Sequence, residues 1–325
     1  MKIGIYGTGA YGLALTSILC ENKNEVTMWT KFESEKEFLL KYRENKELLP
    51  DYKLPGDVKI TNSIEECARN KDLLIIAIPV PFITELCIEL SKYTDQFTKI
   101  CIASKGIEQK TGYFVSQIIS NYLKTEKVSV ISGPSFAKDI IEKKPIGLSL
   151  ASKDLSVKAV VETAFSNDYL KLRYTEDIIG VEICGAIKNV IALAAGILEG
   201  LGASDSTRAM LVTEALHDIE EIIEIFNGDK RTILSYAGFG DLLLTCTSTK
   251  SRNYSYGILV GKGLNKETLD EYIKINTVEG YFTVESIHNL LRDKKVNISL
   301  ISILYDILKG KINSNELLKF LIEKI

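Results

Sequence analysis

The first half of the chain alternates short apolar runs with segments of helical periodicity. Helical patterns lie around 82–91 and 113–123, between apolar runs with the length and composition of strands. The strand-like runs cover 2–6, 25–29, 73–78, 99–104, 128–132, 146–151 and 170–174. Such alternation predicts an α/β domain whose parallel sheet has right-handed crossovers and is extended by the last two runs.

The pattern changes after about residue 179, where amphipathic helices replace the alternation. Between 207 and 226 apolar residues recur at steps of three and four, as in a helix with one buried face. That stripe consists of Ala209, Val212, Leu216, Ile219, Ile223 and Phe226. We therefore predict an α/β domain at 1–180 and an all-helical domain at 181–325.

A glycine-rich turn at 7–12, with the sequence GTGAYG, joins the first strand to a helix-like stretch at 13–20. In a dinucleotide-binding turn, Gly7 would permit the tight turn, Gly9 would let the backbone approach a pyrophosphate, and Gly12 would let the helix pack on the strand. A glycine-rich turn in another α/β protein can have the same sequence motif, but the flanking strand and helix favour a dinucleotide-binding site. Residues 1–180 are therefore predicted to form a doubly wound, Rossmann-type dinucleotide-binding domain.

The end of the second strand bears on which dinucleotide is bound. A site selective for NAD usually places an acidic residue there, on the ribose hydroxyls. Here the strand is followed by Thr30-Lys31-Phe32, and a cation is compatible with the 2′-phosphate of NADP. We therefore favour NADP over NAD, although Lys31 could equally be a solvated lysine at the start of the next helix.

Composition narrows the class of protein. The 325 residues suffice for two domains, and a net charge of −3 with interspersed acids and bases argues against nucleic-acid or membrane-surface partners. The six cysteines lack a CxxC pair or nearby histidines, so we expect reduced thiols and no metal site. No hydrophobic signal segment precedes the first strand, and the apolar run at 190–198 is too short to cross a bilayer. We expect a soluble, cytoplasmic protein.

Candidate ligand-binding residues follow the strands of the predicted sheet, because ligands of open α/β sheets bind beyond the carboxyl ends of the strands. Lys105 follows one strand and Gly133-Pro134-Ser135 follows the next. We expect Pro134 and Ser135 to open a helix whose free amides point into the crevice. A lysine at a strand end is often only solvent-facing, but its place at the crevice favours binding.

Lys188 is the most informative single residue. It lies in the middle of 181–198, a stretch so apolar and so rich in small residues that a buried central helix is predicted. A buried lysine needs a counter-charge. No counter-charge is available on the same face of the helix, where the residues three and four positions before and after Lys188 are Cys184, Gly185, Ile191 and Ala192. The partner must come from elsewhere in the fold or from a ligand, unless the lysine reaches solvent along the helix.

The two histidines are weaker candidates for acid/base chemistry. His217 adjoins the apolar stripe of the 207–226 helix, where we expect a structural role, and His288 lies in a helix with a polar face. Neither is in a crevice-like loop, so Lys188 is the better general acid/base.

A third cluster lies at 238–253. Asp241 follows a Gly-Phe-Gly turn, which is typical of a helix N-cap, and it is also the best available partner for Lys188. Ser251-Arg252-Asn253 combines a planar cation with hydroxyl and amide donors, which suits a phosphate or carboxylate, although such a tripeptide can be a plain loop.

Taken together, the chain resembles the bacterial NAD(P)-dependent glycerol-3-phosphate dehydrogenase family along essentially its whole length. The segments that carry this resemblance are GTGAYG at 7–12, SKGIE at 104–108, ISGPSFA at 131–137, IGVEICGAIKNVIALAAG at 179–196, GDLLLTCTS at 240–248, SRNYSYG at 251–257 and VEGYFT at 278–283. Each motif alone is weak, but their joint occurrence in order is specific.

The resemblance implies reduction of dihydroxyacetone phosphate to sn-glycerol 3-phosphate for phospholipid synthesis, by a homodimer. It implies that Lys188 is the acid/base, with Lys105 shared by cofactor and substrate. Substrate-binding positions would be Gly133, Ser135, Asp241, Ser251, Arg252 and Asn253. Cofactor positions beyond the glycines would be Tyr11, Lys31, Ala137, Arg252 and Glu279.

Some positions depart from the family pattern. Ala10 replaces a serine near the pyrophosphate, and Phe32 replaces an arginine, which weakens the preference for NADP. A Gly-Asp-Asn turn becomes Ser204-Asp205-Ser206, and a later Thr-Arg becomes Thr213-Glu214. We expect Asp205 or Ser206 to cap the helix that follows.

These residues suggest a mechanism. As hydride reaches the carbonyl carbon, negative charge develops on the oxygen, which Lys188 would protonate, with Asp241 orienting it and Lys105 stabilising the charge. Arg252 and Asn253 would hold the substrate phosphate.

Two alternative functions remain at this point. The first is another lysine-based dehydrogenase, which would act on a β-hydroxyacid or sugar acid. The second is a non-catalytic nucleotide sensor, in which the buried cation of Lys188 would be an uncompensated cost in stability.

Overall fold

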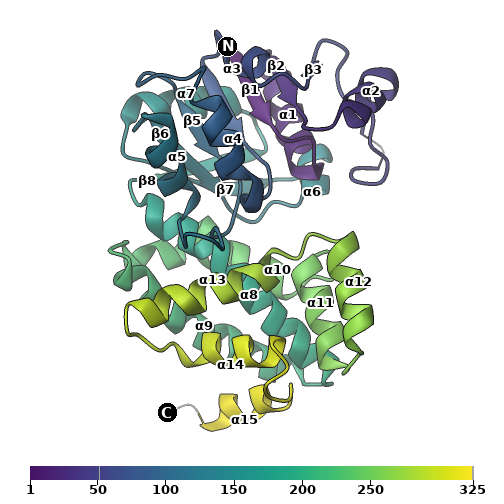
Figure 1. Ribbon diagram of the computed structural model, residues 1–325, viewed down its shortest axis with the longest axis vertical. Coiled ribbons are helices and arrows are strands. Elements are labelled where there is room, and N and C mark those ends of the chain that lie inside the picture. Colours follow the sequence, from purple (N-terminus) through teal and green to yellow (C-terminus); the bar gives the residue numbers. More distant parts are fainter. Residues whose placement is uncertain (51, 324–325) are drawn as a thin grey trace. The chain divides into compact units, whose positions relative to one another are not determined.

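The computed structural model describes residues 1–50 and 52–323. The chain divides into two compact units, the first formed by 1–105 and 115–178 and the second by 106–114 and 179–325. The segment 106–114 therefore packs with the later helices, although it lies between two strands of the sheet in the sequence. The first unit combines a sheet with helices, and the second is helical (Figure 1). This confirms the predicted fold class.

The first unit is built on one eight-stranded sheet with the order β3-β2-β1-β4-β5-β6-β7-β8. The first six strands have the order of a doubly wound dinucleotide-binding sheet. The strands are β1 (Lys2–Tyr6), β2 (Glu25–Trp29), β3 (Lys59–Thr61), β4 (Leu73–Ile76), β5 (Ile100–Ile102), β6 (Val128–Ser132), β7 (Ile146–Ser152) and β8 (Leu170–Thr175). The edge strand β3 was not predicted, because three residues are too few to show alternation.

The strands pair in parallel except for β6 and β7, which are antiparallel. The sequence predicted a parallel sheet extended by the last two strands and did not reveal that β6 and β7 are antiparallel. Parallel neighbours need a crossover over the face of the sheet. Between β6 and β7 the chain forms only the five-residue helix α6 (Ala137–Ile141), which packs on α1 (Ala10–Glu21), so it returns directly alongside β6.

The helices of this unit pack in two groups. Helix α1 contacts α6 and α7 (Leu155–Phe165), and α4 (Ile83–Leu90) contacts α3 (Ile64–Ala68) and α5 (Val115–Leu123). Helix α2 (Glu33–Tyr42) contacts β3, and a short 3-10 turn, η1 (Val80–Phe82), contacts α4. The main core joins α1 and α7 to the sheet through fully buried residues such as Ile3, Leu15 and Val161.

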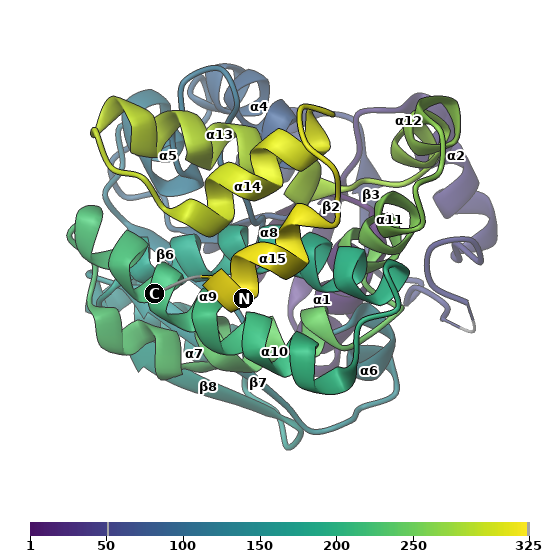
Figure 2. The same ribbon diagram turned by 90° about the horizontal axis from the view of Figure 1, so that it is seen from below.

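The second unit is helical from α8 (Ile178–Gly200) onward, and its described residues contain no strand. Its helices are α8, α9 (Asp205–Ile225), α10 (Asp241–Cys246), α11 (Arg252–Gly261), α12 (Lys266–Ile275), α13 (Glu279–Asp293), α14 (Ser299–Leu308) and α15 (Glu316–Glu323), with the short turns η2 (Lys230–Leu234) and η3 (Tyr236–Gly240) between α9 and α10. Figure 2 shows α9, α13, α14 and α15 arranged about α8.

Helix α8 is the core helix predicted from its composition, and every residue from Gly180 to Leu198 is buried. Its 23 residues are long and apolar enough to cross a membrane, so the argument that the run is too short was wrong. However, 89% of its most apolar stretch is buried inside the protein. Its hydrophobicity is therefore explained by packing within the helical unit.

Helix α9 buries a face that only partly coincides with the predicted stripe, which shares Ile219 and Ile223 with it. Its buried residues are Leu211, Ala215, Asp218, Ile219, Ile222 and Ile223, whereas Ala209 is exposed. The stripe was drawn through apolar residues alone and therefore left out the polar Asp218. His217, for which a structural role beside the stripe was expected, is exposed on the same helix.

Candidate active site

The glycine turn has three glycines with three different surroundings. Gly7 has φ of +127°, and a Cβ there would lie 2.5 Å from the Ala77 carbonyl oxygen. A Cβ on Gly12 would lie 2.2 Å from the Gly7 carbonyl oxygen, so α1 packs directly on the turn. Gly9 has nothing within 4 Å of its Cβ position and caps α1 without a side-chain hydrogen bond. An open space in front of uncapped helix amides fits a pyrophosphate.

The turn after β6 lies against the glycine turn. The Tyr11 hydroxyl and Ser135 Oγ are 3.1 Å apart, and Ser135 Oγ also donates to the Gly133 carbonyl at 3.2 Å. A Cβ on Gly133 would lie 2.6 Å from the Gly147 carbonyl oxygen of β7, so strand packing alone requires glycine there. The structure thus brings together a predicted cofactor residue, Tyr11, and two predicted substrate residues.

The helix expected to open at Pro134 and Ser135 begins later. Its first residue is Ala137 and its N-cap is Phe136. Pro134 and Ser135 instead form part of the bend that leads out of β6, where the Ser135 hydroxyl bonds back to Gly133. The free N-terminal amides of this helix therefore lie further along the chain than predicted.

Lys31 and Lys105 both follow strands at the carboxyl edge of the sheet. Lys31 lies two residues after β2, and its ammonium donates to both carboxylate oxygens of Glu85 at 2.9 Å each. Lys105 lies after β5, is half-buried, and precedes Gly106, whose φ is +133°. Lys31, the cation that favoured NADP, therefore pairs with the carboxylate of Glu85. This partner was not expected from the sequence.

Lys188 and Asp241 form a buried ion pair in the helical unit. Lys188 Nζ lies 2.6 Å from Asp241 Oδ1 and also donates to Thr245 Oγ1 at 3.1 Å. Lys188 is 9% exposed and Asp241 only 1%. The prediction that Asp241 supplies the counter-charge for Lys188 is confirmed.

Asp241 is the first residue of α10 and not its N-cap, which is Gly240. That prediction is wrong because the carboxylate is directed to Lys188. Just before it, the turn η3 is so tight that a Cβ on Gly238 would lie 2.2 Å from the Ile233 carbonyl oxygen. The backbone carbonyl of Asp241 accepts from Thr245 Oγ1 at 2.6 Å, which holds both Lys188 partners on one turn.

The cysteine beside this pair is inert. Burial raises the pKa of Cys246 to about 12, so the thiol stays neutral next to Lys188 and Asp241. None of the six cysteines, all of which lie within the described residues, forms a disulfide. No thiol chemistry is indicated at this site.

The Ser-Arg-Asn cluster forms the N-terminus of α11. Ser251 is the N-cap and accepts from the Tyr254 amide, while Asn253 Oδ1 accepts from the Gly280 amide at 2.8 Å. Both residues are buried, whereas Arg252 is exposed at the first helical position. The flanking residues thus fix the backbone around a guanidinium that faces solvent.

A seam of glycines joins α11 to α8. Cβ atoms on Gly196 and Gly257 would lie 2.0 Å from the Tyr254 carbonyl oxygen and 2.2 Å from the Leu193 carbonyl oxygen. Gly200 and Gly261 make the same kind of approach one turn further along. The two backbones are in direct contact, which fixes the Ser-Arg-Asn cluster relative to the helix that carries Lys188.

The N-terminus of α13 docks beside Lys188. Asn189 Nδ2 donates to Glu279 Oε2 at 2.9 Å, and a Cβ on Gly280 would lie 2.4 Å from the Asn189 carbonyl oxygen. Asn189 and the role of Thr245 were not predicted. Two features of the sequence could have identified them. Asn189 is a polar neighbour of Lys188 in a helix predicted to be buried, and Thr245 lies one helical turn after Asp241.

The substituted turn before α9 is capped by Ser204, whose Oγ accepts from the Thr207 amide at 3.2 Å. The expectation that Asp205 or Ser206 would cap is wrong by one residue. Asp205 instead pairs with Arg208, which also pairs with Glu199 of α8.

Comparisons with known proteins cover both halves of the chain. The model for the N-terminus of NAD-dependent glycerol-3-phosphate dehydrogenase matches residues 2–158, and the model for its C-terminus matches 177–319. A glycerol-3-phosphate dehydrogenase [NAD(P)+] of Staphylococcus haemolyticus is 36% identical over 94% of this chain and 93% of its own length. This chain belongs to the NAD(P)-dependent glycerol-3-phosphate dehydrogenase family. The resemblance drawn from the sequence motifs is therefore confirmed.

Other relatives agree with this assignment. The Staphylococcus aureus glycerol-3-phosphate dehydrogenase [NAD(P)+] is 36% identical over 99% of this chain and 98% of its own length. A crystal structure of glycerol-3-phosphate dehydrogenase from Coxiella burnetii has a TM-score of 0.93 at 27% identity, covering 99% of each chain. D-mandelate dehydrogenase, at a TM-score of 0.64 and 12% identity, shares the fold alone.

Proposed function

We propose that the protein reduces dihydroxyacetone phosphate to sn-glycerol 3-phosphate with NAD(P)H. Family membership supports the reaction, and the buried Lys188–Asp241 pair is the observation that carries the assignment of its proton donor. The product would serve glycerophospholipid synthesis, in the cytoplasm and by a homodimer, as is typical of the family.

The bound reduced nicotinamide would supply a hydride to the carbonyl carbon. As the carbon accepts it, the carbonyl oxygen gains negative charge, and the Lys188 ammonium gives that oxygen a proton. Asp241 and Thr245 hold Lys188 Nζ in one position, so the ammonium is already oriented for proton transfer to the carbonyl oxygen. Lys105 adds a second positive charge that stabilises the developing alkoxide.

The substrate phosphate would bind Arg252 and Asn253. The exposed guanidinium offers two parallel donors to phosphate oxygens, and the Asn253 carbonyl is already used by Gly280, which leaves its amide NH2 to donate. Ser251, Gly133 and Ser135 are proposed to complete the substrate contacts. Binding energy from the phosphate would position the carbonyl for the transfer.

The dinucleotide would bind along the glycine turn. Gly7, Gly9 and Gly12 would form the pyrophosphate site, and Tyr11, Lys31, Lys105, Ala137, Arg252 and Glu279 would add contacts. The preference for NADPH expected from Lys31 depends on a cation whose charge is opposed by Glu85.

The proposed reaction is tested by following reduced-nicotinamide absorbance with dihydroxyacetone phosphate, using NADH and NADPH in parallel. We expect turnover with the phosphate ester and little with unphosphorylated dihydroxyacetone. Equal turnover with the two compounds would instead support a lysine-based dehydrogenase that does not recognise phosphate. Absence of oxidation of either cofactor would favour the nucleotide sensor.

A further inference from the structure

The ammonium of Lys31 and the carboxylate of Glu85 meet at the edge of the sheet where the glycine turn lies. Lys31 follows β2, and the Gly7 amide donates to the Trp29 carbonyl at 3.0 Å, so the end of β2 adjoins the turn. Glu85 lies in the first turn of α4, which follows β4, the strand on the other side of β1. The two side chains therefore converge from opposite sides of the strand that leads into the glycine turn.

The contact between them engages both carboxylate oxygens. Lys31 Nζ lies 2.9 Å from Glu85 Oε1 and 2.9 Å from Oε2. The side chains are 49% and 66% exposed, so the pair contributes little to the stability of the fold. An exposed pair of this kind can, however, change which charges a ligand meets.

Other charges near Lys31 are also mostly negative. Glu35 accepts a hydrogen bond from Thr30, and Glu33 pairs with Lys36 and accepts from Asn62. With Glu85, three carboxylates therefore accompany two lysines around the end of β2. A phosphate group brought here would meet no excess of positive charge.

We propose that Glu85 is a specificity-determining residue that directs the enzyme to NAD(H) by neutralising Lys31. This rests on the proposed function, in which the end of β2 faces the adenosine ribose. A 2′-phosphate would bring about two negative charges next to the Glu85 carboxylate, which repels it and competes for Lys31. The ribose hydroxyls of NAD are neutral and can donate to a carboxylate, so NAD binds without this penalty.

The test is the Glu85→Gln variant, which keeps the size of the side chain and removes its charge. Dissociation constants of NADH and NADPH are measured by the fluorescence of the bound nicotinamide, without substrate. We expect NADPH to bind about tenfold more tightly to Glu85→Gln than to the unmodified enzyme, with NADH changed less than twofold. The gain for NADPH should shrink at high salt, because the repulsion that was removed is screened.

Two further variants separate this effect from general changes in charge. Glu89→Gln removes a carboxylate from the same helix, where Glu89 pairs with Lys92, and should leave both affinities unchanged. In a Lys31→Gln background, Glu85→Gln should improve NADPH binding less, because no cation is released.

A change of less than twofold in the NADPH to NADH affinity ratio on Glu85→Gln would overturn the proposal. So would an unmodified enzyme that binds NADPH more than tenfold more tightly than NADH. Because these measurements need no substrate, they report on Glu85 even if turnover of dihydroxyacetone phosphate is not found.

Discussion

The ammonium of Lys188 has a carboxylate and a hydroxyl as partners, and both come from α10. Removing one charge of a buried pair leaves the other uncompensated, which costs about 3–5 kcal/mol. Evolution would retain such a pair for its chemistry more readily than for stability, since apolar residues of the same volume often stabilise as well. This supports the proposal that Lys188 is a positioned proton donor.

The first prediction concerns Asp241→Asn. The substitution keeps the shape of the side chain but removes the charge that favours the protonated form of Lys188. We expect turnover to fall at least about 100-fold and the alkaline limb of the pH–rate profile to move to lower pH. Thr247→Val is the matched control, because Thr247 lies just after α10 and its hydroxyl donates to the Leu243 carbonyl. An unchanged alkaline limb in Asp241→Asn would contradict the role given to Asp241.

At the scale of single residues, the sequence identified candidate functional residues whose residue type conflicts with their surroundings. Lys188 could be found because a charge in an apolar helix needs an explanation, and Asp241 because few partners were available. Asn189 and Glu85 could not be found in this way. Their roles depend on contacts between residues 90 and 54 positions apart, which no local pattern encodes.

The elements that hold the site are fixed by backbone contacts and caps. The glycine seam sets α11 against α8, and Gly280 sets α13 against the same helix. Such tertiary contacts also determine where a helix begins and which of its faces is buried. Sequence patterns located these helices but did not predict those two details. The helix after β6 begins at Ala137 because the preceding bend bonds to itself, and α9 buries a face that includes Asp218.

The second prediction concerns the glycine seam. In Gly257→Ala the added Cβ would lie 2.2 Å from the Leu193 carbonyl oxygen, so α11 must move away from α8. We expect a loss of about 1–3 kcal/mol in the free energy of unfolding and a raised KM for dihydroxyacetone phosphate. Gly56→Ala is the control, since nothing lies within 4 Å of its Cβ position. Equal urea midpoints for the two variants would show that the helices are not in the contact described.

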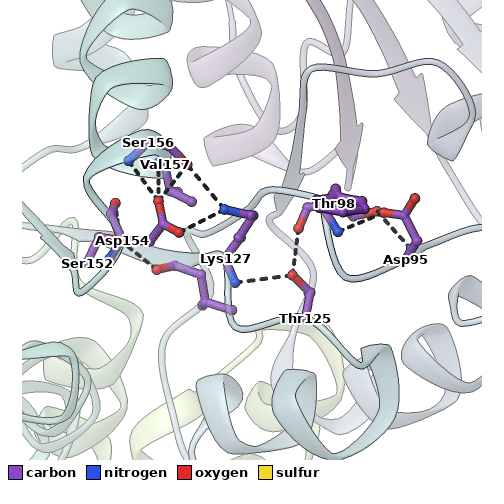
Figure 3. A network of polar contacts seen from close by, with 10 residues as sticks. Asp95, Thr98, Thr125, Lys127, Ser152, Asp154, Ser156 and Val157 are labelled. Atoms are coloured by element: carbon purple, nitrogen blue, oxygen red, sulfur yellow. Dashed lines mark hydrogen bonds and ion pairs between the residues drawn. The ribbon is translucent and has the colours of Figure 1, made fainter.

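The third prediction concerns the N-cap of α7. Asp154 accepts from the Ser156 and Val157 amides at 2.7 and 3.1 Å and pairs with Lys127 at 2.9 Å (Figure 3). The Ser156 hydroxyl and the Lys127 ammonium hold the pKa of Asp154 well below its usual range. A lowered pKa means that the stabilisation is complete above the ordinary carboxyl pKa of about 4 and is lost as the pH falls further.

We therefore expect Asp154→Ala to lower the free energy of unfolding at pH 7 by about 1 kcal/mol, as for other N-caps. The difference from the unmodified protein should narrow as the pH falls below about 4, because the carboxylate of the unfolded chain is then protonated before that of the folded protein. Urea unfolding at several pH values measures this. A difference that stays constant down to acidic pH would exclude the charge of Asp154 as its source.

At the scale of the whole molecule, fold class and family were predictable because they depend on many weak patterns that agree. Several motifs in one order identify the family even though the glycine turn carries a substitution at Ala10. The membership of 106–114 in the helical unit was not predictable. Phe114 is 1% exposed and packs edge-to-face on Phe226 at 5.6 Å, a contact between distant positions of the chain.

The fourth prediction follows from that contact. Phe114→Ala should lower the free energy of unfolding by about 3–5 kcal/mol, because it empties a buried aromatic site. Phe97→Ala should change stability little, since Phe97 is 66% exposed. Similar thermal midpoints for these variants would show that 106–114 is not integral to the helical unit.

The central claim is that Lys188 is the proton donor, and the Lys188→Met variant tests it most directly. The thioether side chain fills much of the same space without a charge, so cofactor binding on the glycine turn should be unchanged. We expect the rate of dihydroxyacetone phosphate reduction to fall by at least about 1,000-fold, a loss of about 4 kcal/mol of transition-state stabilisation. A rate within about tenfold of the unmodified enzyme, which corresponds to about 1.4 kcal/mol, would contradict the account.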